Sequence, residues 1–62
     1  MRDVKAQDLR PGDLILDVMG NIAWMCISLT PFGSNFDVVW WSFKGGKTIV
    51  DRTYERSHFL VL

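Results

Sequence analysis

Short apolar segments separated by turn-forming residues are the feature that most limits how this chain can fold. Five strands are expected, over residues 13–18, 22–29, 36–43, 48–54 and 58–62. The intervening segments are rich in Gly, Pro and Asn, which favour turns because glycine reaches conformations that other residues avoid and proline presets φ. No helical periodicity extends beyond a turn near residues 6–9. This spacing predicts a single all-β domain over residues 1–62, either a barrel or a compact sheet, and we favour a small five-stranded antiparallel barrel.

The first turn lies in "DLRPGD", residues 8–13, where Pro11 and Gly12 reverse the chain before the first predicted strand. Asp8 and Asp13 bracket the turn. Carboxylates in such positions are solvated and cap local backbone donors. No other group in the sequence converges on them as an acid and base pair would require, so the motif is interpreted as architectural.

Size and charge limit the classes of function. A chain of 62 residues buries only about 60% of its unfolded surface, so its core is marginal and a binding partner would stabilise it. Seven basic and seven acidic residues give no net charge, which weighs against general nucleic-acid binding. The single cysteine, Cys26, excludes an internal disulfide, and we expect a buried free thiol in a reduced cytoplasmic protein.

A membrane association is not expected. The first eight residues, "MRDVKAQD", are polar and do not resemble a signal peptide. Residues 18–36 carry no charge over 19 positions, which approaches the length of a bilayer span. Glycine, proline and asparagine crowd both ends of this segment, however, and its continuous apolar part, residues 22–29, has the length of a strand.

A hairpin at Gly45-Gly46 allows the pairing of the third and fourth predicted strands to be derived. With these two residues as the loop, Trp41 lies opposite Val50, Val39 opposite Arg52, and Asp37 opposite Tyr54. The face with apolar residues opposite each other is the better core face. Val39, Trp41 and Val50 are therefore predicted to be buried.

The second predicted strand has one uniformly apolar face, made of Ala23, Met25, Ile27 and Leu29, which we expect to join the core. Trp24 then points outward, near Val38 and Trp40 of the next strand. These three residues would form an exposed apolar patch, which predicts an interface with a protein partner or a second copy of the chain. Two alternatives remain open: loops or terminal residues cover the patch, or the sheet curves enough to bury both faces.

No catalytic, cofactor-binding or metal-binding residues are predicted. The "GGKT" at residues 45–48 has Trp41 where a phosphate-binding loop needs a glycine, and a strand is expected where that loop needs a helix. His58 is the only histidine and has no ligand-like spacing to other residues. A chain of this size also has little room for an enclosed pocket, so neither an enzyme nor a small-molecule substrate is expected.

Nucleic-acid binding is the alternative function. Small barrels can stack bases on exposed aromatic side chains and hold phosphates with basic ones. Lys44 and Lys47, expected to face each other across the hairpin, would supply positive charge together with Arg52. One of the tryptophans would supply the stacking platform.

A family resemblance covers nearly the whole chain. The order of "VKAQDLRPGD" at Val4–Asp13, a tryptophan-bearing strand ending in "SLTP", "GKT" at Gly46–Thr48, "RTY" at Arg52–Tyr54 and a final apolar strand resembles small SH3-like β-barrel proteins of actinobacteria and their bacteriophages. The resemblance implies a phage or prophage accessory protein that works in the bacterial cytoplasm by binding a host or phage protein. It supplies no catalytic or binding residues.

Overall fold

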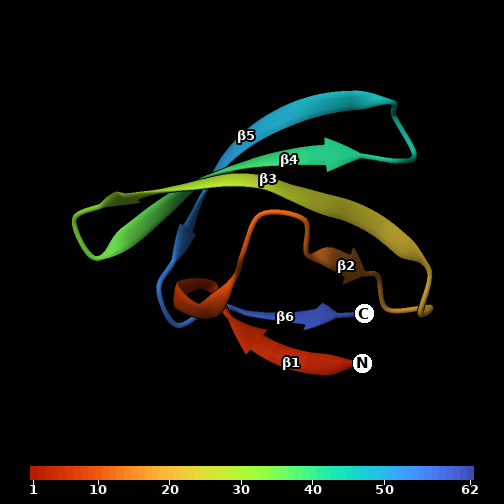
Figure 1. Cartoon of the computed structure of the whole chain (residues 1–62), viewed down its shortest axis with the longest axis horizontal. Helices are drawn as coiled ribbons and strands as arrows, with labels where there is room; N and C mark the ends of the chain where they lie inside the picture. Colours follow the sequence, from red (N-terminus) through yellow and green to blue (C-terminus); the bar gives the residue numbers. More distant parts are fainter.

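The computed structural model describes all residues from 1 to 62 as one curled antiparallel sheet of six strands in the order β1-β6-β2-β3-β4-β5. A single 3-10 turn, η1 (Ala6–Asp8), connects the first two strands. The strands are β1 (Arg2–Lys5), β2 (Leu14–Leu16), β3 (Ile22–Phe32), β4 (Asn35–Ser42), β5 (Lys47–Tyr54) and β6 (His58–Val61). In Figure 1, β3, β4 and β5 form the upper part, whereas β1, β6 and β2 lie below them, with the two termini side by side.

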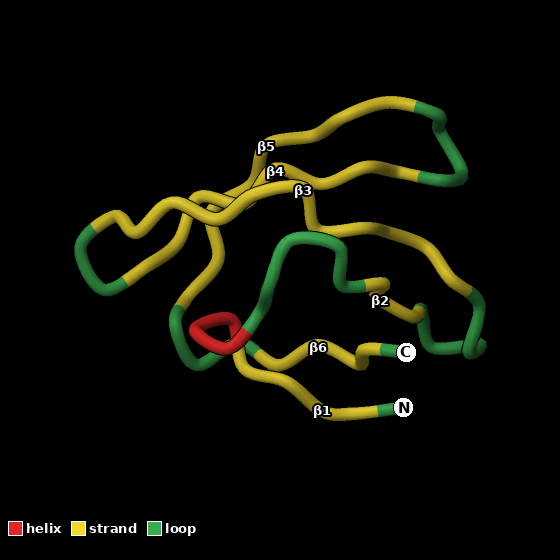
Figure 2. Tube along the Cα trace, in the orientation of Figure 1, coloured by secondary structure: helices red, strands yellow, loops and turns green.

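The all-β antiparallel architecture is confirmed, and each predicted segment contains a strand. The count of five strands was wrong, because β1 adds a sixth. The sheet is also open, since its edge strands β1 and β5 are not paired with each other. Figure 2 shows that the first part of β5 lies apart from β1, β2 and β6, whereas its end descends toward the loop that leads to β6. No helix is long and apolar enough to cross a membrane.

Strand β1 has the sequence RDVK and therefore no apolar run; Val4 is its only apolar residue and its only buried one. It is held by antiparallel pairing with β6, in which Val4 lies opposite Phe59. Just beyond it, the backbone N–H of Ala6 donates to the carbonyl of Ser57 at 2.8 Å. Long-range pairing rather than local pattern therefore creates this strand, which explains why the sequence did not reveal it.

The turn predicted in "DLRPGD" is present. The Asp13 N–H donates to the Arg10 carbonyl at 3.1 Å, and the Asp13 carboxylate accepts from the Arg10 N–H at 2.9 Å. Gly12 has a φ of +94°, a value that suits glycine after proline in a type II turn. The turn docks on β3, because Gly12 donates to the Cys26 carbonyl at 2.7 Å and Cys26 donates to the Asp13 carbonyl at 2.9 Å.

The core lies on the concave side of the sheet. Its buried apolar members are Val4, Leu9, Ile15, Cys26, Val38, Trp40 and Val61, and Trp24, Leu29, Phe36 and Phe59 pack against them. The predicted burial of the Cys26 thiol is confirmed.

The predicted faces of β4 and β5 were inverted. Val38 is 0% exposed and Trp40 7%, whereas Val50, predicted to be in the core, is 69% exposed. The hairpin also has a four-residue loop, residues 43–46, which places Val39 opposite Val50 and Trp41 opposite Thr48. This shift of two positions keeps the same residues on each face. The error therefore came from the choice of core face, since apolar residues line both sides of β4.

A β-bulge at Ile27 explains the corresponding error in β3. Cys26 pairs with Trp40, but Ser28 pairs with Val39, so Ile27 is an extra residue. A bulge changes which alternate residues point inward. On β3 the concave face therefore carries Trp24 and Cys26 before the bulge and Leu29 after it. The prediction that Ala23, Met25, Ile27 and Leu29 share one core face was wrong.

Candidate functional site

The convex face of β3, β4 and β5 carries an apolar surface. The cross-strand pairing aligns Met25 with Trp41 in one row and Val39 with Val50 in the next. Met25, Val39 and Trp41 are half-buried, and Val50 is exposed. We call these four residues the convex patch. It has the apolar, partly exposed character of an interaction surface.

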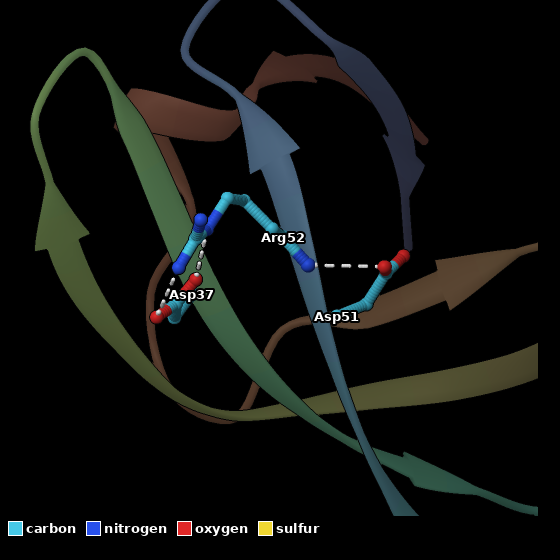
Figure 3. Close-up of polar contacts among 3 residues, drawn as sticks. All are labelled: Asp37, Asp51 and Arg52. Carbon is cyan, nitrogen blue, oxygen red and sulfur yellow. Dashed lines mark hydrogen bonds and ion pairs between the residues drawn. The ribbon is translucent and has the colours of Figure 1, made fainter.

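The ion pair between Arg52 and Asp37 borders the convex patch. Arg52 Nε donates to Asp37 Oδ1 at 2.8 Å, while the Arg52 guanidinium carbon lies 3.9 Å from the centre of the Phe32 ring. The hydrogen bond from Arg52 lowers the pKa of Asp37 and, reciprocally, raises the pKa of Arg52. In Figure 3 the Arg52 side chain points toward Asp37, whereas the Asp51 side chain lies on the other side of β5. Arg52 is thus already engaged on the convex face.

The concave face contains a cavity of about 320 Å³. Eight residues line it: Ile15, Leu16, Trp24, Trp40, Ile49, Asp51, Thr53 and Phe59. The rings of Trp40 and Phe59 lie 5.5 Å apart between centres, inclined at 49°. The open arrangement of β5 relative to β2 and β6 leaves this space accessible, so the chain has a small, mostly apolar cavity with one carboxylate.

The sequence-predicted patch of Trp24, Val38 and Trp40 does not lie on an outer surface. All three side chains belong to the concave side, where Val38 and Trp40 are buried and Trp24 packs against the core. They are buried because this is the core face of the sheet, the reverse of the predicted assignment, while the opposite face stays partly exposed. Trp24 and Trp40 nevertheless come together, as walls of the cavity.

The predicted nucleic-acid residues do not form one cluster. Lys44 lies in the β4–β5 loop and Lys47 pairs with Ser42. The prediction that the two lysines face each other across the hairpin was therefore wrong. Both are exposed, as is Phe43, the residue before Lys44. Arg52 lies further along β5 and bonds Asp37.

Two further side chains that could carry chemistry have structural roles: Cys26 is buried and His58 contacts Asp3. Burial, reinforced by the charge of Asp13, raises the pKa of the Cys26 thiol to about 11. His58 Nδ1 lies 3.0 Å from Asp3 Oδ1, in an exposed contact between β6 and β1. No group of three or more His, Cys, Asp or Glu side chains is arranged to hold a metal ion.

Sequence reasoning missed Asp51 and Phe59 as cavity residues. Both lie on strands that were expected. The cavity forms only because the sheet curls, so that β5 and β6, which are not neighbours in the sheet, line the same space. Alternation along β5 was the available signal, because it places Ile49, Asp51 and Thr53 on one face.

No family model matches the chain, and no curated protein or solved structure matches it.

Proposed function

We propose that the chain is a non-enzymatic protein-interaction module that binds a second copy of itself, or another protein, through the convex patch. The observation that carries this proposal is the partly exposed apolar character of that face, with Val50 69% exposed beside Val39. The SH3-like barrel relationship and the role as a phage or bacterial accessory protein in the cytoplasm belong to the same proposal, on the sequence resemblance described above.

The size of the protein favours self-association. A standard interface buries about 800 Å² per partner, which is about a fifth of the 4298 Å² surface of this chain. A two-fold dimer would bring the same patch from each copy together. Covering Val50 and its neighbours would add apolar burial to a core that is small for independent stability.

The experiment compares the oligomeric state of native protein with that of Val50→Asp and Leu60→Asp by sedimentation and light scattering. Leu60 is the matched control, because it is also an exposed aliphatic residue but lies on β6, away from the convex patch. We expect a native dimer that Val50→Asp converts to a folded monomer and Leu60→Asp does not.

A monomeric native protein would exclude the homodimer. The same two variants then test a different protein partner, by cross-linked capture from lysate. A partner retained equally by native protein and Val50→Asp would contradict a role for the convex patch.

The hairpin loop supports a second candidate, nucleic-acid binding, because it carries Phe43, which is 47% exposed, followed by the exposed Lys44, with the exposed Lys47 at the start of β5. An exposed aromatic ring can stack on a base while nearby basic side chains neutralise phosphates. This candidate predicts binding to a single-stranded oligonucleotide that falls steeply as salt rises and is lost in Lys44→Gln/Lys47→Gln. Absence of binding at low salt would exclude it.

A further inference from the structure

The concave cavity combines aromatic walls with an isolated negative charge. Trp24, Trp40 and Phe59 contribute rings from β3, β4 and β6. Its volume of about 320 Å³ is at the small end of the range for ligand sites, about 300–1,000 Å³. A site of this size suits one compact chemical group rather than a large substrate.

Asp51, which is exposed to solvent, gives the cavity its charge. Its carboxylate accepts a hydrogen bond from the backbone N–H of Arg52 at 3.0 Å. The three ion pairs of the protein are Arg2–Asp13, Arg52–Asp37 and His58–Asp3, so Asp51 has no cationic partner. The guanidinium of Arg52 is bonded on the opposite face of β5 (Figure 3). The cavity therefore favours a cation.

The scarcity of polar groups in the cavity selects the type of cation. Asp51 and Thr53 are the only polar side chains lining it. A lysine ammonium has three N–H donors and an arginine guanidinium five, and any of these donors turned toward the apolar walls would lose its water without gaining a partner. A quaternary ammonium has no N–H, and its methyl groups carry the charge against ring faces, where cation–π attraction operates.

We propose that this cavity binds a trimethylammonium group, with Trp24, Trp40 and Phe59 contacting the methyl groups and the Asp51 carboxylate balancing the charge. The site lies on the opposite face of the sheet from the convex patch and is independent of the proposed dimer. Either a small solute or a trimethylated lysine of another protein could carry the group.

The test titrates native protein with choline and with the uncharged analogue in which carbon replaces the choline nitrogen, while NMR follows the indole N–H signals of Trp24 and Trp40. We expect both signals to shift with choline, and the uncharged analogue to bind roughly ten-fold more weakly. Equal binding of the two compounds, or no shift with choline at millimolar concentrations, would overturn the proposal.

Two variants test the assigned residues. Asp51→Asn should weaken choline binding about two- to five-fold, whereas the matched control Asp37→Asn, on the convex face, should leave it unchanged. Phe59→Leu keeps an apolar side chain but removes a ring, so it should weaken choline binding more than binding of the uncharged analogue. Unchanged choline affinity in folded Asp51→Asn would contradict the role of the carboxylate.

A peptide containing trimethyllysine, compared with the same peptide containing lysine, distinguishes the two sources. Tighter binding of the trimethylated peptide than of choline indicates a protein side chain as the natural ligand. Tighter binding of choline indicates a small solute. Equal binding of the two peptides would contradict recognition of the trimethylammonium group.

Discussion

Arg52 and Asp37 lie directly opposite each other on β5 and β4, and their side chains form a hydrogen-bonded ion pair of 2.8 Å on the convex face. The predicted register had instead placed Val39 beside Arg52. The four-residue hairpin loop brings the two charges together, and Phe32 supports the guanidinium from the neighbouring strand. The pair therefore follows from the register of β4 and β5 and lies next to the convex patch.

Asp37→Asn should reduce stability at neutral pH and lose its effect in acid. The hydrogen bond from Arg52 lowers the pKa of Asp37 in the folded protein, below the value of about 3.9 for a free aspartate. The ionised pair thus stabilises the fold above that value, and this contribution disappears as pH falls through the folded pKa. Urea denaturation of native protein and Asp37→Asn, at neutral and acidic pH, measures the difference.

A double-mutant cycle provides the control for this ion pair. Once Arg52→Gln has removed the guanidinium, a further Asp37→Asn change should have a smaller effect than it has in native protein. High salt should reduce the coupling, because both side chains are partly exposed. Strictly additive effects of the two substitutions would show that the pair does not couple.

Two valine substitutions test which face of the sheet is buried. Val38→Ala removes atoms from a fully buried site and should cost about 2 kcal/mol of unfolding free energy. Val50→Ala, the same chemical change on the convex face, should cost less than about 0.5 kcal/mol in the monomer. Chemical denaturation at low protein concentration measures both. A larger loss for Val50→Ala would reverse the assignment of the two faces.

The two hairpin glycines should respond differently to substitution. Gly46 has a φ of +61°, a conformation that costs residues with a Cβ about 1 kcal/mol or more, so Gly46→Ala should be destabilising. Gly46→Asn should be milder, because asparagine tolerates this region better. Gly45 has no such φ, and an added Cβ would lie 3.4 Å from Ser42 Oγ, an ordinary contact. Thermal unfolding should therefore show Gly45→Ala close to native, and equal losses at both positions would contradict this difference.

The parts of the fold that depend on local chemistry were predictable from sequence. Turn residues placed the loops, and β-branched and aromatic residues placed five of the six strands. What failed depends on distant contacts: β1 exists through β6, and the concave face follows from the bulge at Ile27. With apolar residues on both sides of β4, alternation alone could not say which side is buried. The sequence therefore predicted an exposed apolar patch but placed it at Trp24, Val38 and Trp40, whereas the exposed apolar surface is the convex patch on the other side of the sheet.

The Cys26 thiol should be protected in the native protein and reactive when it unfolds. Cys26 is 0% exposed, and its pKa is raised to about 11 by burial and by Asp13. Because the thiolate is the reactive form, and its fraction at pH 8 would be about one thousandth with this pKa, native labelling by a thiol reagent should be slower than labelling in urea by more than about a hundred-fold. Comparable rates in the two conditions would show that the thiol is accessible.

The same thiol makes stability depend on pH in the alkaline range. An unfolded cysteine ionises with a pKa of about 8.5, whereas folded Cys26 keeps its proton until about 11. Between these values the folded state binds more protons than the unfolded state, so stability falls as pH rises above about 8.5. Cys26→Ala should remove this component while lowering stability at neutral pH through lost packing. Urea denaturation across the alkaline range measures both effects, and an identical alkaline decline in native protein and Cys26→Ala would rule out Cys26 as its source.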